Sequence, residues 1–177
     1  MAKKSYMKMS LKPKIEVAKI INIKYMSIKI REALSSEIAI LLDFEAGIIE
    51  AERPFDCTLK TGEIHYYDLL EMIQSEKATV IVAEFDHEIV GSGYAKILKG
   101  KDYQKFGQYA YLGFMFVKPT FRGQGINAKI IDHLIEWSKS KNISEVRLEV
   151  YDENTIAKNS YLKIGFKPIM LEMRMEI

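Results

Sequence analysis

Cysteine is almost absent from the sequence: Cys57 is the only one among 177 residues, which excludes an internal disulfide and a multi-cysteine metal site. Long apolar runs are missing too, and none approaches the roughly 20 residues of a membrane-spanning helix. The excess of charge of one sign is small, since the sequence has 26 Lys and Arg residues and 24 Asp and Glu residues. We therefore expect a cytoplasmic protein without a metal, a nucleic-acid partner or a membrane partner.

The chain length and an apolar content of 48% are typical of one globular domain. No repeat, low-complexity block or Gly/Ser/Pro-rich linker divides it. The start, "MAKKSYMKMSLKPK", is basic, but no apolar segment follows it as in a secretory signal. We interpret residues 1–24 as a basic arm or an extension of the first strand, and residues 25–177 as a single domain.

Apolar periodicity predicts the element order β, α, α, β, β, β, α, β, α, β. The predicted strands lie around 28–30, on both sides of the Asp86-His87 turn within 78–98, and at 109–117, 144–151 and 169–177. The predicted helices are 35–53, capped by Ser35 or Ser36 and with Gly47 as a candidate break, then 63–76, 123–141 and 154–164. This order indicates an α/β fold: a mixed, twisted sheet with helices on both faces.

The junction "VKPTFRGQGINAKIIDHLIEW" (117–137) runs from a strand through two glycines into a helix. The first amide groups of a helix lack internal partners and lie at the positive end of its dipole, so glycines before them let an anion approach closely. Two interpretations stay open from this segment alone, a tight turn and a phosphate cradle, and Arg122 either contacts the phosphate or holds the loop. The dinucleotide pattern is not met, because Ala128 stands in the third glycine's place, and the Lys-Ser/Thr of a P-loop is absent.

A second segment, "YDENTIAKNSYLKIGFKP", opens another helix about 30 residues later. With it, the sequence resembles the GNAT superfamily of acyl-CoA-dependent N-acyltransferases from about residue 26 to the end. The family's phosphate loop follows a Val-x-Pro, here Val117-Lys118-Pro119, and is matched by Arg122, Gly123, Gln124, Gly125, Ile126 and Asn127. The family's second motif is matched at Asn154, Ala157, Tyr161, Gly165 and Phe166. One departure is Asn127, where the family has Gly or Ala.

The resemblance implies that acetyl-CoA binds as co-substrate, with its pyrophosphate on residues 122–127. It places the pantetheine arm along the backbone of Met115, Phe116 and Val117, in a cleft that opens after the fourth strand. Gly113 is expected to mark the bulge that opens this cleft. By the same resemblance, Asn154 hydrogen-bonds the arm and Tyr161 is the general acid that protonates the departing thiolate.

The general base is not given by the motifs. Some family members carry a glutamate four residues before the first pantetheine contact, but Tyr111 stands there in this chain. Three alternatives stay open: a water chain lined by Tyr111 or Tyr109, His65 at the start of the second predicted helix, and a surface role for His65. His87 is interpreted as a turn residue and His133 as a solvated helix residue.

The resemblance places the acceptor between the central strand and residues 45–67. There Glu50, Glu52 and Asp56 either attract a protonated amine or, with Arg53, belong to a solvated helix end. Tyr66 and Tyr67 either line the site or pack in the core. We expect a small-molecule primary amine as acceptor; a protein or peptide amine, and an acetyl-CoA sensor without catalysis, are the alternatives. The edge strand predicted at 169–177 makes a homodimer possible.

Overall fold

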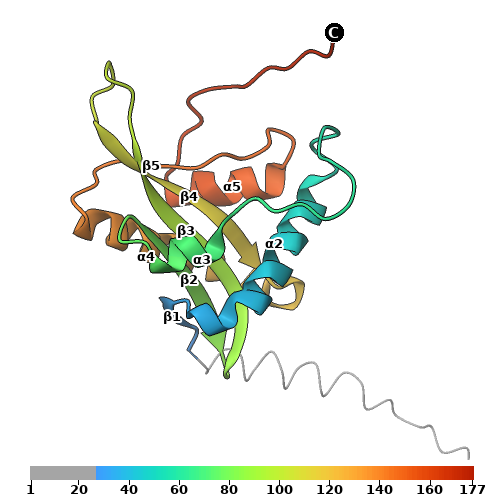
Figure 1. Cartoon of the computed structure of the whole chain (residues 1–177), viewed down its shortest axis with the longest axis vertical. Helices are drawn as coiled ribbons and strands as arrows, with labels where there is room; N and C mark the ends of the chain where they lie inside the picture. Colours follow the sequence, from blue (N-terminus) through green and yellow to red (C-terminus); the bar gives the residue numbers. More distant parts are fainter. Residues whose placement is uncertain (1–26) are drawn as a thin grey trace, which may run out of the picture.

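The computed structural model describes residues 27–177, so the segment interpreted as a basic arm, 1–24, lies outside the described residues. The described chain forms a five-stranded sheet in the order β1-β2-β3-β4-β5 (Figure 1). Its strands are β1 (Lys29–Glu32), β2 (Ala78–Phe85), β3 (Glu88–Lys99), β4 (Gln108–Val117) and β5 (Val146–Arg147). Neighbouring strands are antiparallel except β4 and β5, which are parallel. The expected mixed sheet is confirmed.

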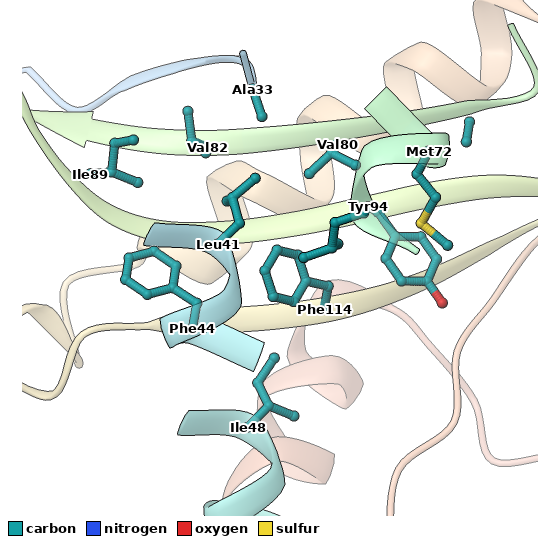
Figure 2. Packing of buried hydrophobic residues seen from close by; sticks show 12 residues of the cluster. Ala33, Leu41, Phe44, Ile48, Met72, Val80, Val82, Ile89, Tyr94 and Phe114 are labelled. Carbon is teal, nitrogen blue, oxygen red and sulfur yellow. The ribbon is translucent and has the colours of Figure 1, made fainter. Parts of the chain in front are cut away.

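Helices cover both faces of the sheet, as predicted. The 3₁₀ turn η1 (Ser35–Glu37), α2 (Ile38–Glu52) and α3 (Leu69–Gln74) precede the β2–β3 hairpin, whereas η2 (Pro119–Phe121), α4 (Ile126–Ser140) and α5 (Thr155–Ile164) follow β4. One core joins α2 and α3 to the sheet, and Figure 2 shows Leu41 and Phe44 of α2 facing Val82 and Phe114 there. A second core packs Ile130 and Leu134 of α4 on the other face. The alternating side chains of β2 serve both cores: Val80 and Val82 face the first, and Ile81 and Ala83 the second.

The predicted hairpin is confirmed. Asp86 and His87 form a two-residue connection between β2 and β3, and both have a positive φ, 49° and 64°. A type I′ turn requires positive φ at both central residues because its twist matches that of the flanking strands. Asp tolerates this conformation better than most residues.

Two predictions about the first helix are wrong. Gly47 does not break α2, which is continuous from Ile38 to Glu52. A Cβ at Gly47 would lie 2.8 Å from the Phe116 ring, so the glycine lets the helix approach β4 closely. Neither Ser35 nor Ser36 caps the helix start; instead the Glu37 carboxylate accepts a hydrogen bond from the Leu34 amide at 2.8 Å.

The second helix is shorter than predicted. Only Leu69–Gln74 is helical, and Asp68 caps it by accepting from the Glu71 amide at 2.9 Å. Residues 63–68 are not helical because the amides of Tyr66 and Tyr67 bond to a side chain of α2. His65 therefore lies in the loop before α3 and not at a helix start.

The last two predicted strands are overestimated. The segment 144–151 pairs with β4 only through Val146 and Arg147. The alternating segment 169–177 is not a strand: Figure 1 shows it leaving the body of the molecule, and its apolar side chains, Ile169, Leu171, Met173, Met175 and Ile177, are exposed. Alternation makes a strand only where a sheet edge supplies hydrogen-bond partners, and within residues 27–177 no strand pairs with this segment. No helix among the described residues is long and apolar enough to span a membrane.

Candidate active site

The loop at residues 122–127 has a backbone that requires its two glycines. Gly123 and Gly125 have φ of 76° and 75°, in the left-handed region that L side chains avoid. A Cβ added at either position would meet nothing within 4 Å, so the glycines are not needed for packing and the space beside them is open. Gly125 is the N-cap of α4 and has no side chain that caps the first amides. The loop thus combines open space with helix amides that can donate hydrogen bonds to an anion.

Arg122 and Ile126 hold the two ends of this loop. The Nε of Arg122 donates to the Val117 carbonyl at 3.0 Å, which closes the turn between β4 and α4. Ile126 is 2% exposed and anchors the helix start in the second core. The side chain of Gln124, between the glycines, is exposed. This contact is in keeping with the predicted role of Arg122 in holding the loop, and its contact with a phosphate stays a prediction.

A bulge in β4 separates this strand from its neighbour. The β3–β4 register shifts between Ser92 and Tyr94, so that β4 carries one extra residue there. Phe114 has a φ of 59°, and its carbonyl accepts from the Ser92 hydroxyl at 3.1 Å. Gly113 was expected to mark the bulge; it directly precedes Phe114, and a Cβ on it would lie 2.6 Å from the Tyr94 ring. The glycine therefore makes room for Tyr94, beside the bulge.

β4 has an open side beyond Tyr111. It pairs with β5 only at Ala110 and Tyr111, as expected for strands that splay after the fourth strand. The Lys118 amide donates to the Val90 carbonyl of β3. Because neighbouring residues of a strand direct their backbone groups to opposite sides, Val117 and Met115 direct theirs to the open side.

Phe116 differs from its two neighbours. It pairs with Ser92 of β3, and its ring packs on Phe44 of α2 with centroids 4.5 Å apart. Among the three residues predicted to lie along the pantetheine arm, Met115 and Val117 thus present backbone groups to the open side, while Phe116 connects the strand to the core.

The second motif forms the ends of α5. The Asn154 Oδ1 accepts from the Ala157 amide at 3.1 Å, and Gly165 ends the helix with a φ of 113°. Tyr161 packs its ring against Phe166 with centroids 6.1 Å apart. Burial, with a contribution from Glu52, raises the pKa of Tyr161 to about 12. Its hydroxyl therefore keeps its proton at neutral pH, which a general acid requires.

Asn127, the departure from the family pattern, connects the two motifs. Its Nδ2 donates to the Ser160 hydroxyl at 3.5 Å, from the first turn of α4 to the residue before Tyr161. The distance is at the long end for a hydrogen bond, so the contact is weak. Its place explains how a polar side chain is accommodated at the loop's last position.

A chain of aromatic rings leads from the loop before α3 to β4. We call Tyr66, Tyr67, Tyr94 and Tyr111 the tyrosine cluster. Its ring centroids lie 5.7 Å apart between Tyr66 and Tyr67, 5.2 Å between Tyr67 and Tyr94, and 6.4 Å between Tyr94 and Tyr111. Burial is the main cause that raises the pKa of all four hydroxyls. The cluster therefore supplies neutral hydroxyl groups beside the bulge.

Glu52 is the carboxylate shared by this cluster and Tyr161. It ends α2, is half-buried, and burial raises its pKa, with Tyr66 opposing the rise. Its negative charge contributes to the raised pKa of five tyrosines: Tyr66, Tyr67, Tyr111, Tyr151 and Tyr161. The sequence suggested Glu52 only as one of several acidic groups near the acceptor. Its central position depends on where α2 ends.

Glu149 is a further acidic group that the sequence analysis treated only as part of a strand's polar face. It follows β5 by two residues, and it contributes to the raised pKa of Tyr94 and Tyr111, after burial. The available signal was its place in the strand predicted at 144–151, and alternation alone does not reveal its role beside the tyrosines.

His65 contacts two carboxylates. Its Nδ1 lies 2.8 Å from Glu45 Oε2 and its Nε2 lies 3.6 Å from Glu63 Oε1. The Glu45 contact, more than any other cause, raises the pKa of His65. These two carboxylate contacts favour a structural role for His65, and its role as base stays a prediction.

The other acidic residues near the end of α2 differ in environment. Glu50 forms an exposed pair with Arg53 at 2.7 Å, and Arg53 also donates to the carbonyls of Lys60 and Gly62, as in the solvated-end interpretation. Asp56 is buried; it accepts from the Thr58 hydroxyl and amide, from Tyr151 and from Arg174. These contacts, of which those with Thr58 have the largest effect, lower the pKa of Asp56 to about 2.

Two further features of residues 27–177 bear on the site. No group of three or more His, Cys, Asp or Glu side chains there is arranged to hold a metal. A cavity of about 450 Å³ lies between the last turns of α4 and β5, lined by residues such as Ile135, Ser138 and Val146. It is at the opposite end of α4 from residues 122–127, so it is not the place where the loop would hold an anion.

Comparison with known proteins identifies a family. Residues 48–166 match the model of the acetyltransferase (GNAT) family. Thialysine N-epsilon-acetyltransferase of Bos taurus is 42% identical over 59 residues, which are 33% of this chain and 35% of that protein. The chain thus matches only about a third of the length of this relative.

Solved structures have the same fold. A predicted acetyltransferase of Clostridium acetobutylicum, in a structure with acetyl-CoA, has a TM-score of 0.63 at 20% identity, over 84% of this chain and 96% of that one. The aminoglycoside acetyltransferase AAC(6')-Iy, in complex with the bisubstrate analog CoA-S-monomethyl-acetylneamine, has a TM-score of 0.63 at 21% identity, over 85% and 99% of the two chains. At these identities the likeness concerns the fold alone.

Proposed function

The chain belongs to the acetyltransferase (GNAT) family, and we propose that it transfers acetyl from acetyl-CoA to a primary amine of a small molecule. The observation that carries the proposal is the arrangement at the open side of β4. A loop with two positive-φ glycines starts α4, and a partly buried tyrosine, Tyr161, lies on α5, with the two helices in contact through Asn127. Acetyl-CoA takes part as co-substrate, and the proposal needs no metal.

The donor would bind along β4 and at the start of α4. Residues 122–127 would surround the pyrophosphate with helix amides, and the backbone groups of Met115 and Val117 would pair with the amides of the pantetheine arm, as an added strand pairs with a sheet edge. Asn154, at the start of α5, is proposed to hydrogen-bond the same arm. Phe116 would support the strand through its contact with Phe44.

The reaction is direct attack of a neutral amine on the thioester carbonyl. The C–N bond forms and the C–S bond breaks, the amine loses one proton, and the CoA sulfur gains one. We assign the sulfur's proton to the Tyr161 hydroxyl, whose high pKa keeps it protonated. We assign the amine's proton to Glu52, since burial moves its pKa toward the neutral range and its charge acts on Tyr161. The charge of Glu52 also contributes to the raised pKa of Tyr111.

The acceptor region favours a cationic amine. Glu52 and Glu149 both act on the tyrosine cluster, and hydroxyl groups and ring faces both suit an ammonium group. A thialysine acetyltransferase and an aminoglycoside acetyltransferase are among the similar proteins, which supports a small amine. The exposed apolar side chains of 169–177 support a homodimer as a further part of the proposal.

An acetyl-CoA sensor without catalysis is the second candidate, favoured by one observation: Tyr111 stands where some family members carry a glutamate. Free thiol released from acetyl-CoA is measured with a panel of thialysine, lysine, polyamines, aminoglycosides and peptides, and acetyl-CoA binding is measured by calorimetry. Release with a small amine is expected. Binding with no release across the panel would support the sensor, and absence of binding would refute both candidates.

Tyr161→Phe tests the acid. It should lower kcat about 100-fold or more while the Kd for acetyl-CoA changes less than about twofold, because the hydroxyl acts only in the transition state. Tyr103→Phe is the matched control, since Tyr103 is 81% exposed on the β3–β4 loop. Equal turnover of the two variants would remove Tyr161 from the acid role.

A further inference from the structure

A buried carboxylate on α2 has no part in the chemistry described above. Glu45 is 1% exposed. Its Oε1 accepts from the amides of Tyr66 and Tyr67 at 2.7 and 2.9 Å, and its Oε2 lies 2.8 Å from His65 Nδ1. A buried carboxylate is costly unless it is hydrogen-bonded, and here three successive residues of one loop supply the partners. The carboxylate therefore fastens the segment 65–67 to α2.

This contact decides the conformation of the loop. The sequence around 63–68 has the apolar spacing of a helix, yet α3 begins only at Leu69. The amides of Tyr66 and Tyr67 bond to Glu45, so they are not part of a helical ladder. Glu45 thus holds these two residues in a non-helical conformation.

The two tyrosines extend from Glu45 to the proposed reaction site. The Tyr67 ring contacts Tyr94 at 5.2 Å and Phe114 at 5.6 Å between centroids, and Phe114 is the residue of the β4 bulge. Glu52 lies two turns after Glu45 on the same side of α2. Glu45 thereby links two parts of the proposed site: it holds Tyr67, which packs on the β4 bulge, and it lies on the same side of α2 as Glu52, which we assign as base.

Tyr66 adds an observation that indicates a ligand. Its hydroxyl oxygen is buried and has no hydrogen-bond partner at normal distance among residues 27–177. Glu52 is near enough to contribute to its pKa, after burial, but the geometry of a hydrogen bond is not met. A buried hydroxyl without a partner is unfavourable, and a polar group of a bound amine would satisfy it.

We propose that Glu45 is a positioning residue for the amine acceptor: it fixes Tyr66 and Tyr67 so that the Tyr66 hydroxyl binds the acceptor beside Glu52 and Tyr67 supports the β4 bulge. The proposal names a specificity determinant and rests on the proposed function only for its kinetic part. If Glu45 served stability alone, its loss would affect donor and acceptor alike.

Amide exchange tests the contact without any assay of activity. Hydrogen exchange at the Tyr66 and Tyr67 amides is followed by NMR in the whole chain and in Glu45→Ala, Glu45→Gln and Ser138→Ala. Ser138 is a buried polar residue of α4, 1% exposed, near the C-terminal end of that helix, and controls for general loss of stability. Glu45→Ala should speed exchange at both amides about tenfold or more, while Glu45→Gln, whose side-chain carbonyl still accepts, should retain most of the protection.

Kinetics test the consequence, with the most active amine of the panel as acceptor. Glu45→Ala should raise the acceptor KM about tenfold or more and leave the Kd for acetyl-CoA within about twofold, and Glu45→Gln should restore the KM. Tyr66→Phe should raise the acceptor KM without changing exchange at the Tyr67 amide. Should Glu45→Ala fail to fold, Glu45→Gln and Tyr66→Phe carry the test.

Two results overturn the proposal. One is unchanged exchange at both amides in Glu45→Ala. If that variant does not fold, the corresponding result is an acceptor KM for Tyr66→Phe equal to that of the unsubstituted chain. The other is a loss of acetyl-CoA affinity as large as the loss of acceptor affinity. A panel with no active amine would count against the proposed function, and the exchange result would then decide for or against the contact.

Discussion

Replacing Gly125 with alanine separates the two interpretations of the loop between β4 and α4. The residue has a φ of 75°, a conformation that costs an L residue about 1–2 kcal/mol. Nothing lies within 4 Å of the added Cβ, so no steric term is added in the chain without donor. For a domain of this size, that cost lowers the melting temperature by about 2–8 °C.

Gly62→Ala is the matched control. Gly62 has a φ of 89°, and a Cβ there also meets nothing within 4 Å, but it lies in the loop before α3. Both variants should therefore lose a similar amount of stability. Only Gly125→Ala places a methyl group where we expect the pyrophosphate, so only this variant should raise the Kd for acetyl-CoA, by about tenfold or more, the equivalent of about 1.4 kcal/mol.

The assays are thermal melting without donor and calorimetric titration with acetyl-CoA. Equal melting shifts combined with an unchanged Kd in both variants would refute the reasoning, because the glycines would then serve a turn alone. An equal rise in Kd in both variants would refute it too, since the effect would follow stability and not the position of the methyl group.

Two further predictions concern pH. Glu52→Gln should lower kcat about 100-fold or more and remove the acidic limb of the pH–rate profile, because a base is active only above its pKa, which burial raises here; Glu50→Gln, at an exposed carboxylate, should keep that limb. The contacts of Asp56, above all the two hydrogen bonds from Thr58, lower its pKa from 3.8 to about 2. These contacts therefore stabilise the fold above pH 3.8, and this contribution is lost as the pH falls through about 2. Thermal melts should show a steeper loss of stability between about pH 4 and pH 2 in the unsubstituted chain than in Asp56→Asn, and parallel curves would contradict this account.

Local sequence signals were enough where one segment contains both the cause and the effect. Asp86 and His87 between two β-rich runs predicted a two-residue hairpin, and Gly165 predicted the end of α5. Apolar spacing predicted a helix at 123–141, and α4 is observed at Ile126–Ser140. In each case the required backbone conformation is set by residues within a few positions along the chain.

Local signals failed where a distant group competes. The segment 63–68 has helical spacing, but the Glu45 carboxylate, about 20 residues earlier, takes the amides of Tyr66 and Tyr67. Gly47 was expected to break a helix, and it instead permits close contact with Phe116, which lies 69 positions later in the chain (116 − 47). The alternating segment 169–177 lacks a paired sheet edge, so its pattern alone does not make it a strand.

The sequence by itself determined the family resemblance and predicted which residues hold a donor, because each of the two motifs is one continuous segment of the chain. Only the tertiary structure decided which acidic group lies among the tyrosines and near Tyr161. Glu52, Tyr66, Tyr111 and Tyr161 come from four separate segments, and their mutual effects on pKa depend on the folding of α2, α5 and the loop before α3 around the end of β4. Electrostatic coupling acts through space over a few ångströms, so it cannot be inferred from how far apart two residues are in the sequence.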